Sequence, residues 1–560
     1  MKSAAKAVAL IILFGAVLVH AQLPTFQHVI LVIQENRTPD NLFAGIPPQN
    51  GWTGTWFEEG VDLAQAPDAK QWCLGACFDP GHGNADWKKQ YNDGVYSPHA
   101  NSVTTSNCKS SKRTTTCNAN PVCVYPNQCT YQVPQYSQDS YVSYTYDMTG
   151  SQHVLDPYVS IATQYGFANY FYQTNQGPSQ SAHDFLFGGT SSPTGSSSGA
   201  NGQYLYDFAA GNPSPAPTNP TGCLAPQTQY RSLLNPAGKN FAKYYYPCFD
   251  HATLSDLLEN ATPSLTWRYY TNSNGDIWTA PNGISHICQP TGNPLQCQTG
   301  SDFSKHVVLN GATQSSPQPI LADISNCQLQ NVSWVIPNGD WSDHAGFISN
   351  NQSSAEIEGG PNWVADIVNA VGQSYTNSGG KCDYWKAQPT VIFVVWDDWG
   401  GWYDHMAAGY EVNTSSCWPN CQLWGEGYTY GFRVPLLVVS AYTRDGTVSG
   451  ACGGPGQAPC PNNVFPYQHD FGSLLAFIEY NFLGSDFIGQ INPQYPFADA
   501  YAPEIVHDPA IIPLTEFFTL STPKSFEAIT TVNNSFTLDY FKNYNGPVVD
   551  PDNDAVDPED

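Results

Sequence analysis

Basic residues are scarce in this sequence. Its 560 residues include 20 lysines and arginines against 47 aspartates and glutamates, which gives a formal net charge of -27 at pH 7. Nucleic acids and anionic membrane surfaces repel a chain of this charge, so neither is an expected docking partner. The excess of acidic residues therefore argues against two large classes of function.

Long apolar runs are absent beyond the N-terminal segment. Residues 1–21 are predicted to be a signal peptide, with Lys2 and Lys6 before an apolar core at 8–19 and the small-residue cleavage pattern VHA at 19–21. No later stretch reaches the roughly 18 uninterrupted apolar residues of a membrane helix. We expect a secreted or periplasmic protein without stable membrane insertion.

The chain also lacks a CxxC pair, although it contains 16 cysteines. Zinc binding by these cysteines is therefore the less favoured interpretation. In an exported chain, an even number of cysteines predicts disulfides. The pairs expected to be local are Cys73/Cys77, Cys417/Cys421 and Cys452/Cys460, and four more cysteines share one long loop: Cys108, Cys117, Cys123 and Cys129.

Neither an internal repeat nor a convincing linker divides the chain between residues 22 and 520. Short stretches rich in Pro, Gly and Ser, at 188–202 and 212–221, are typical of surface loops. We expect one catalytic domain over residues 22–520 and a C-terminal extension over 521–560 that ends in an acidic, proline-rich tail.

Two apolar runs are typical of strands that are buried on both faces of a parallel sheet. They are HVILVI at 28–33 and TVIFVVW at 390–396, and each ends abruptly in polar residues. Open α/β sheets bind ligands at the carboxyl ends of their strands. If the two strands are neighbours, four oxygen-bearing side chains meet at that edge: Glu35, Asn36, Asp397 and Asp398. Such a group predicts a divalent cation, because uncompensated carboxylates repel each other. A simple polar strand exit is the alternative.

Ser179 lies at the expected start of a helix. Residues 167–173 resemble a short strand, a Gly-Pro turn follows, and 179–187, SQSAHDFLF, opens the helical pattern. A serine in this position usually only caps the helix. The same position also directs the helix dipole at a bound phosphate, and a neighbouring metal would make the hydroxyl a nucleophile. The negative charge of the chain does not exclude such a substrate, because a bound cation dominates the local field.

Two histidines are further candidates. His82 lies in a Gly/Pro turn, and His344 follows a short expected strand at 332–337. For each, an exposed or structural histidine is the alternative. Expected helices at 362–371 and 473–482 alternate with the strands, as a βαβ architecture requires.

Taken in order, five segments resemble the bacterial phosphoesterase family, which includes the non-haemolytic phospholipases C and the acid phosphatase A type enzymes. The segments are HVILVIQENR, GPS, SDH, WDDWGGWYDH and GFRVP, and the resemblance spans residues 26–485. Because this family is related to the alkaline phosphatases, the resemblance implies a three-layer α/β/α sandwich with a mostly parallel central sheet and long disulfide-bonded loops.

The resemblance also implies roles for the candidate residues. Ser179 corresponds to the nucleophile, which would form a phosphoserine, and His82 and His344 correspond to histidines of the phosphate pocket. The implied ligands of one divalent ion (Zn, Ca, Mg or Mn) are Glu35, Asn36, Asp397 and Asp398. The spacing from Asp340 to His344 is similar to the second metal site of alkaline phosphatases, so a site with two ions is an alternative.

The chain departs from the phospholipases C of the family at two places. They commonly have an Asn-Arg pair shortly after the nucleophile, where this chain has Ala182 and His183, and they tend to carry extra C-terminal β domains. Both departures favour an acid phosphatase-like enzyme acting on a small phosphate ester. The alternatives are a phospholipase C that cleaves phosphatidylcholine-type lipids and a non-catalytic protein that binds phosphate ligands. A sulfatase is less favoured, because no Cys/Ser-x-Pro-x-Arg pattern surrounds Ser179.

Overall fold

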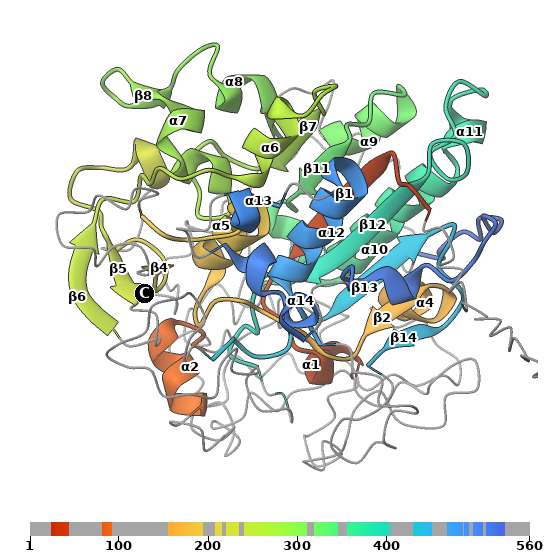
Figure 1. The fold of residues 1–560 in the computed structure, drawn as a ribbon, viewed down its shortest axis with the longest axis horizontal. Helices are drawn as coiled ribbons and strands as arrows, with labels where there is room; N and C mark the ends of the chain where they lie inside the picture. Colours follow the sequence, from red (N-terminus) through yellow and green to blue (C-terminus); the bar gives the residue numbers. More distant parts are fainter. Residues whose placement is uncertain are drawn as a thin grey trace, which may run out of the picture.

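The computed structural model in Figure 1 describes residues 24–43, 81–91, 155–193, 208–214, 220–234, 240–310, 318–344, 355–402, 404, 429–450, 468–484, 487–491, 497–507 and 511–531. The predicted signal peptide lies outside these residues. So do the cysteines for which the sequence predicted local pairs or a cluster: Cys73, Cys77, Cys108, Cys117, Cys123, Cys129, Cys417, Cys421, Cys452 and Cys460.

An eight-stranded sheet forms the centre of the described structure. Its strands, in spatial order, are β10 (Val307–Leu309), β7 (Trp267–Thr271), β11 (Val332–Val335), β1 (His28–Gln34), β12 (Thr390–Trp396), β13 (Leu436–Ser440), β2 (Gly166–Ala168) and β14 (Thr447–Ser449). All neighbours are parallel except that β13 is antiparallel to both β12 and β2. The predicted α/β fold with a mostly parallel sheet is confirmed.

The strands β1 and β12 occupy the middle of this sheet. Every residue of both strands is buried, which explains their continuous apolar sequences. They pair in parallel, from His28 opposite Thr390 to Gln34 opposite Trp396. Their carboxyl ends are therefore level, and the polar residues that follow the two strands lie side by side, as the sequence predicted.

Helices cover both faces of the sheet (Figure 1). The longer ones around it are α4 (Asp156–Gln164), α5 (Ser179–Gly188), α6 (Leu254–Asn260), α9 (Pro319–Ser325), α10 (Ala355–Gly372) and α12 (Phe471–Leu483). From β12, Phe393 packs against Phe477 of α12, whereas Trp396 packs against Tyr158 of α4. Residues three apart on a strand face opposite sides, so α12 and α4 lie on opposite faces. Contacts of α12 with α5 and α6, and of α10 with α4 and α9, complete the two outer layers.

Further helices and strands surround these layers. The helices are α1 (Pro39–Phe43), α2 (Asn84–Tyr91), α7 (Ser285–Cys288), α8 (Asp302–His306), α11 (Ser374–Asn377), α13 (Ile488–Ile491) and α14 (Pro503–His507). The strands of the small sheets are β3 (Phe171–Tyr172) with β15 (His469–Asp470), β4 (Phe208–Ala209) with β5 (Arg231–Leu234) and β6 (Asn240–Tyr245), and β8 (Pro290–Thr291) with β9 (Gln296–Cys297). Across the described ranges, no helix has the length and apolar character needed to cross a membrane.

The segment expected as one strand at 167–173 is two short strands. The first, β2, pairs within the main sheet, and the second, β3, pairs with β15. The chain leaves the main sheet between them, and Asn169 donates its backbone N–H to the oxygen of Ser449 there. This change of direction brings the following turn and Ser179 to the carboxyl edge of the sheet.

Three disulfides join described cysteines: Cys223–Cys248, Cys288–Cys297 and Cys327–Cys382. They confirm that the chain uses cysteines as cross-links. The first two lie in one loop region around α7. The third joins Cys327, just after α9, to Cys382, which follows α11.

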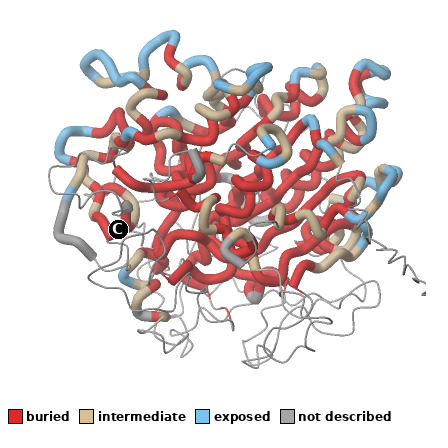
Figure 2. The backbone as a smooth tube through the Cα atoms, viewed as in Figure 1, coloured by how far each residue is buried: buried red, intermediate tan, exposed pale blue. Residues whose placement is uncertain are grey.

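The described start of the predicted C-terminal extension packs on the domain. Phe526 lies against Trp385 with ring centroids 5.0 Å apart, and the backbone N–H of Ile529 donates to Asn369 Oδ1 at 2.8 Å. Figure 2 shows the sheet and its flanking helices as one buried core, with exposed residues at the outer loops. The residues discussed below lie within this buried region.

Candidate functional site

The exits of β1 and β12 are locked together by the carboxylate of Asp397. Its Oδ1 accepts the backbone N–H groups of Asn36 at 3.0 Å and of Asp398 at 2.7 Å. The four residues Glu35, Asn36, Asp397 and Asp398 are all fully buried. The structure therefore brings together the four predicted metal ligands, at the sheet edge where the sequence placed them.

A left-handed backbone at Asn36 and Gly400 allows the two exits to approach. Both residues have positive φ, 60° and 62°, a region that favours glycine and is tolerated by asparagine. The backbone N–H of Gly400 donates to Asp398 Oδ1 at 2.6 Å, and a Cβ at this position would overlap the backbone of Asn36. Only glycine fits here without moving the β1 exit.

Ser179 is the first residue of α5, and Pro178 before it is extended. Its hydroxyl donates toward Glu35 Oε2 at 3.1 Å and Asp398 Oδ2 at 3.4 Å, so it contacts a carboxylate from each strand exit. The preceding turn is fixed by Asn175 Nδ2, which donates to the oxygens of Gly177 and Pro178 at 2.6 and 3.2 Å. The predicted nucleophile thus lies against the predicted metal ligands.

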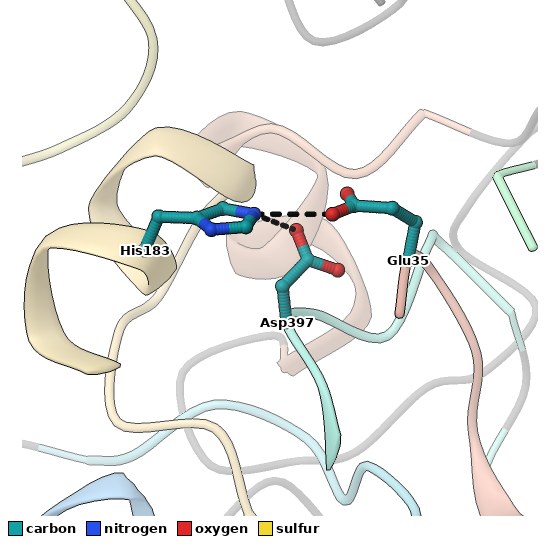
Figure 3. Close-up of side chains that lie close together, drawn as sticks. All are labelled: Glu35, His183 and Asp397. Carbon is teal, nitrogen blue, oxygen red and sulfur yellow. Dashed lines mark hydrogen bonds and ion pairs between the residues drawn. The ribbon is translucent and has the colours of Figure 1, made fainter. Parts of the chain in front are cut away.

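His183 joins this group one helical turn further along α5. Its Nε2 lies 3.0 Å from Glu35 Oε1 and 3.9 Å from Asp397 Oδ2. Figure 3 shows the three side chains pointing toward one another from the helix and from the two strand exits. Glu35, His183 and Asp397 each offer a donor atom within 4.8 Å of the others, a spacing at which they could hold a metal ion. Sequence reasoning noted His183 as a departure but missed it as a site residue, although its spacing of four from Ser179 puts both on one helix face.

His82 and His344 also lie at this edge. Asn36 Nδ2 is 3.1 Å from His82 Nε2, and the rings of His82 and His344 meet edge to face with centroids 5.7 Å apart. The ring centroid of Trp278 lies 6.4 Å from that of His344. His82 therefore contacts Asn36 of the predicted metal site, and His344 packs against His82. Of the proposed second-metal pair, the side chain of Asp340 lies outside the described residues.

The model of the phosphoesterase family matches residues 26–483 of the chain. The chain belongs to the phosphoesterase family. A non-hemolytic phospholipase C of Burkholderia pseudomallei (strain K96243) is 26% identical to this phosphoesterase over 209 residues, which cover 34% of this chain and 24% of the relative. The match therefore spans about a quarter of the relative's length.

Behind the site of this phosphoesterase, Asp343 fixes the segment that carries His344. Its carboxylate accepts from Tyr158 OH at 2.8 Å and from Trp396 Nε1 at 3.0 Å. Arg37 donates to the backbone oxygen of Asp343 through Nε at 2.9 Å and Nη2 at 2.6 Å. Burial raises the pKa of Asp343 to about 6, and the nearby guanidinium of Arg37 opposes that rise.

The donor atoms of the site fit a divalent cation. Asp397 Oδ2 and Asn36 Oδ1 are buried and make no hydrogen bond within the described residues. A buried carboxylate oxygen without a partner is costly, and a metal ion removes that cost. Carboxylate and amide oxygens suit Ca²⁺, Mg²⁺ and Mn²⁺, and an added imidazole suits Zn²⁺. The assignment of particular residues as ligands stays a prediction.

Proposed function

We propose that this chain is a secreted, metal-dependent phosphoesterase that hydrolyses phosphate esters through a phosphoserine at Ser179. One observation carries the proposal: the hydroxyl of Ser179 lies within 3.1 and 3.4 Å of Glu35 and Asp398, at the first residue of α5. A hydroxyl that contacts two buried carboxylates has an acceptor for its proton. The family match supports the choice of a phosphoric ester as substrate.

The mechanism follows from these contacts. A divalent ion held by Glu35, Asn36, Asp397 and Asp398 would lower the pKa of the attacking hydroxyl and neutralise charge on the phosphate. Ser179 Oγ forms a bond to phosphorus, and the proton of the serine hydroxyl passes to Glu35 or Asp398. The bond from phosphorus to the alcohol oxygen breaks. The N-terminal N–H groups of α5, which begins at Ser179, would stabilise the negative charge of a phosphate bound to this serine.

Protonation of the leaving alkoxide falls to His82 or His344, whose rings lie beside each other at this edge. Water then attacks phosphorus, releases inorganic phosphate or a phosphomonoester, and restores the serine hydroxyl. In this second step the proton of water passes to the histidine that lost its own, and the carboxyl group protonated in the first step returns its proton to Ser179 Oγ as the Oγ–phosphorus bond breaks. Each bond made and broken is therefore matched to a group within the described site.

A small phosphate monoester is the proposed substrate, and a phospholipid is the second candidate. The departure at Ala182 and His183 favours the monoester. The similarity to a phospholipase C favours the lipid. Incubation with a phosphate monoester and, separately, with phosphatidylcholine at pH 5 and pH 7 separates them, because the products are inorganic phosphate and phosphocholine.

The decisive variant is Ser179→Ala. We expect no release of phosphorus from either substrate and no trapped phosphoserine, with metal content largely kept. The matched control is Ser325→Ala, since within the described part of the chain the Ser325 hydroxyl donates to the backbone oxygen of Leu321 in its own helix α9. Full activity of Ser179→Ala contradicts the proposed nucleophile. Binding of phosphate ligands without turnover in the unaltered chain supports the non-catalytic alternative instead.

A further inference from the structure

We propose that His183 is a metal ligand through Nε2, and that this imidazole makes the site prefer Zn²⁺ and similar ions to Ca²⁺ and Mg²⁺. The inference rests on the metal site in the proposed function and deepens it. It assigns a role to His183 of α5, which is not one of the four predicted ligands that follow β1 and β12.

The distances around Nε2 fit a shared ion. Two ligands of a tetrahedral zinc ion, each about 2.1 Å from it, are roughly 3.4 Å apart. His183 Nε2 lies 3.0 Å from Glu35 Oε1 and 3.9 Å from Asp397 Oδ2, which bracket this value. All three residues are fully buried, and Figure 3 shows the three donor atoms converging on one point. A single ion can therefore reach one atom of each.

The other ring nitrogen is held by Tyr269. The Tyr269 oxygen lies 3.4 Å from His183 Nδ1, and its hydroxyl donates to the backbone oxygen of Trp278 at 2.6 Å. The proton of the Tyr269 hydroxyl is therefore directed at Trp278 and away from His183. The Tyr269 oxygen is then an acceptor for Nδ1–H, which leaves the lone pair of Nε2 toward Glu35 and Asp397. A metal-bound histidine commonly donates its second N–H in this way.

A simple ion pair between His183 and Glu35 is the competing arrangement. It accounts for the contact at 3.0 Å, but the separation of 3.9 Å from Asp397 Oδ2 is too long for a hydrogen bond, and among the described residues that oxygen has no hydrogen-bond partner. An ion between the three groups satisfies both carboxylates at once. The two arrangements differ in the first coordination shell of the bound metal.

X-ray absorption spectroscopy of the full chain, loaded with one equivalent of Zn²⁺, measures that shell. A His306→Gln background removes the other group of described residues spaced to hold an ion, which is Glu259, Asp302 and His306. In this background we expect imidazole scattering that is lost in His183→Gln and kept in His82→Gln. An oxygen-only shell, or imidazole scattering that survives His183→Gln, overturns the inference.

Competition titrations give a second readout that uses a milder variant. Tyr269→Phe removes the acceptor of Nδ1–H, and loss of such a partner lowers metal affinity by about 10- to 100-fold. We expect this loss for Zn²⁺ and little change for Ca²⁺; equal changes for both ions contradict the role of His183. If phosphate release depends on a metal whose coordination shell contains only oxygen, the role of His183 is wrong but the proposed function stands. If the chain binds no divalent ion, the proposed function is wrong as well.

Discussion

Ser179 and His183 contact the two oxygens of one carboxylate, that of Glu35. The serine hydroxyl lies 3.1 Å from Oε2, and the imidazole Nε2 lies 3.0 Å from Oε1. The two residues are one turn apart on α5, so one helix face delivers both to the end of β1. Glu35 is therefore the link between the predicted nucleophile and the predicted metal site.

Replacing this link is the first test. Glu35→Gln keeps the shape of the side chain but removes its charge, and with it an acceptor for the serine proton and a metal ligand. We expect kcat for phosphate release to fall by roughly 10²- to 10⁴-fold, the range for loss of a proton-transfer group. The bound metal should fall in parallel. Glu527→Gln, at an exposed position, is the matched control and should leave both unchanged.

A second prediction follows from the close approach of Gly400 to Asn36. Gly400→Ala places a Cβ against the backbone of Asn36 and imposes a positive φ on alanine. We expect a loss of thermal stability and weaker metal binding, because the two strand exits must separate. Gly300→Ala is the control, since Gly300 also has positive φ, 89°, but nothing lies within 4 Å of its Cβ position. That variant should lose only the backbone term of about 1–2 kcal/mol and keep its metal. Equal metal loss in both variants would contradict the contact.

The buried ion pair between Arg433 and Asp404 yields a third prediction. Arg433 donates to Asp404 through Nη2 at 2.9 Å, and its Nη1 donates to the backbone oxygen of Asn169 at 2.8 Å. Both charged residues are buried. Asp404→Asn leaves the guanidinium without its counter-charge, and loss of one partner of a buried pair costs about 3–5 kcal/mol. Chemical denaturation measures this loss. An unchanged midpoint would show that the pair is not formed.

The sequence was most informative where side-chain chemistry changed abruptly along a buried strand. Glu35 and Asp397 were found because continuous apolar runs end at them, and parallel pairing then brings such ends together. His183 was missed because its partner Glu35 is 148 residues away in the sequence. The helical spacing puts His183 on the face of Ser179, but that spacing is the same for a histidine with a purely structural role. The antiparallel direction of β13 was also hidden, because a buried strand has the same apolar sequence in either direction.

The pairing of cysteines shows the same limit. The described disulfides join residues 25, 9 and 55 positions apart, and only the pair Cys288–Cys297 is local in sequence. Connectivity depends on which loops fold side by side, and spacing along the chain does not encode that. Secretion stays a prediction, and mass spectrometry of the exported protein should find a new N-terminus at Gln22.

Two buried carboxyl groups predict how stability depends on pH. Glu479 of α12 and Asp499 are both buried, and each has one oxygen without a hydrogen-bond partner within the described residues. Burial raises the pKa of Asp499 to about 7, and burial together with the nearby Asp499 raises the pKa of Glu479 well above its ordinary value. In the unfolded chain both groups titrate near pH 4.

The direction in which the free energy of unfolding changes with pH follows from proton binding. Between about pH 4 and pH 7 the folded chain holds a proton on Asp499 that the unfolded chain has released, so the free energy of unfolding falls as pH rises. The contribution is complete below pH 4 and is lost as pH rises through about 7; the raised pKa of Glu479 adds in the same direction. We expect a lower urea midpoint at pH 8 than at pH 5, and a smaller difference in Glu479→Gln, which carries no charge at either pH. If the difference is as large in Glu479→Gln and in Asp499→Asn as in the unaltered chain, other groups control the pH dependence and this assignment is wrong.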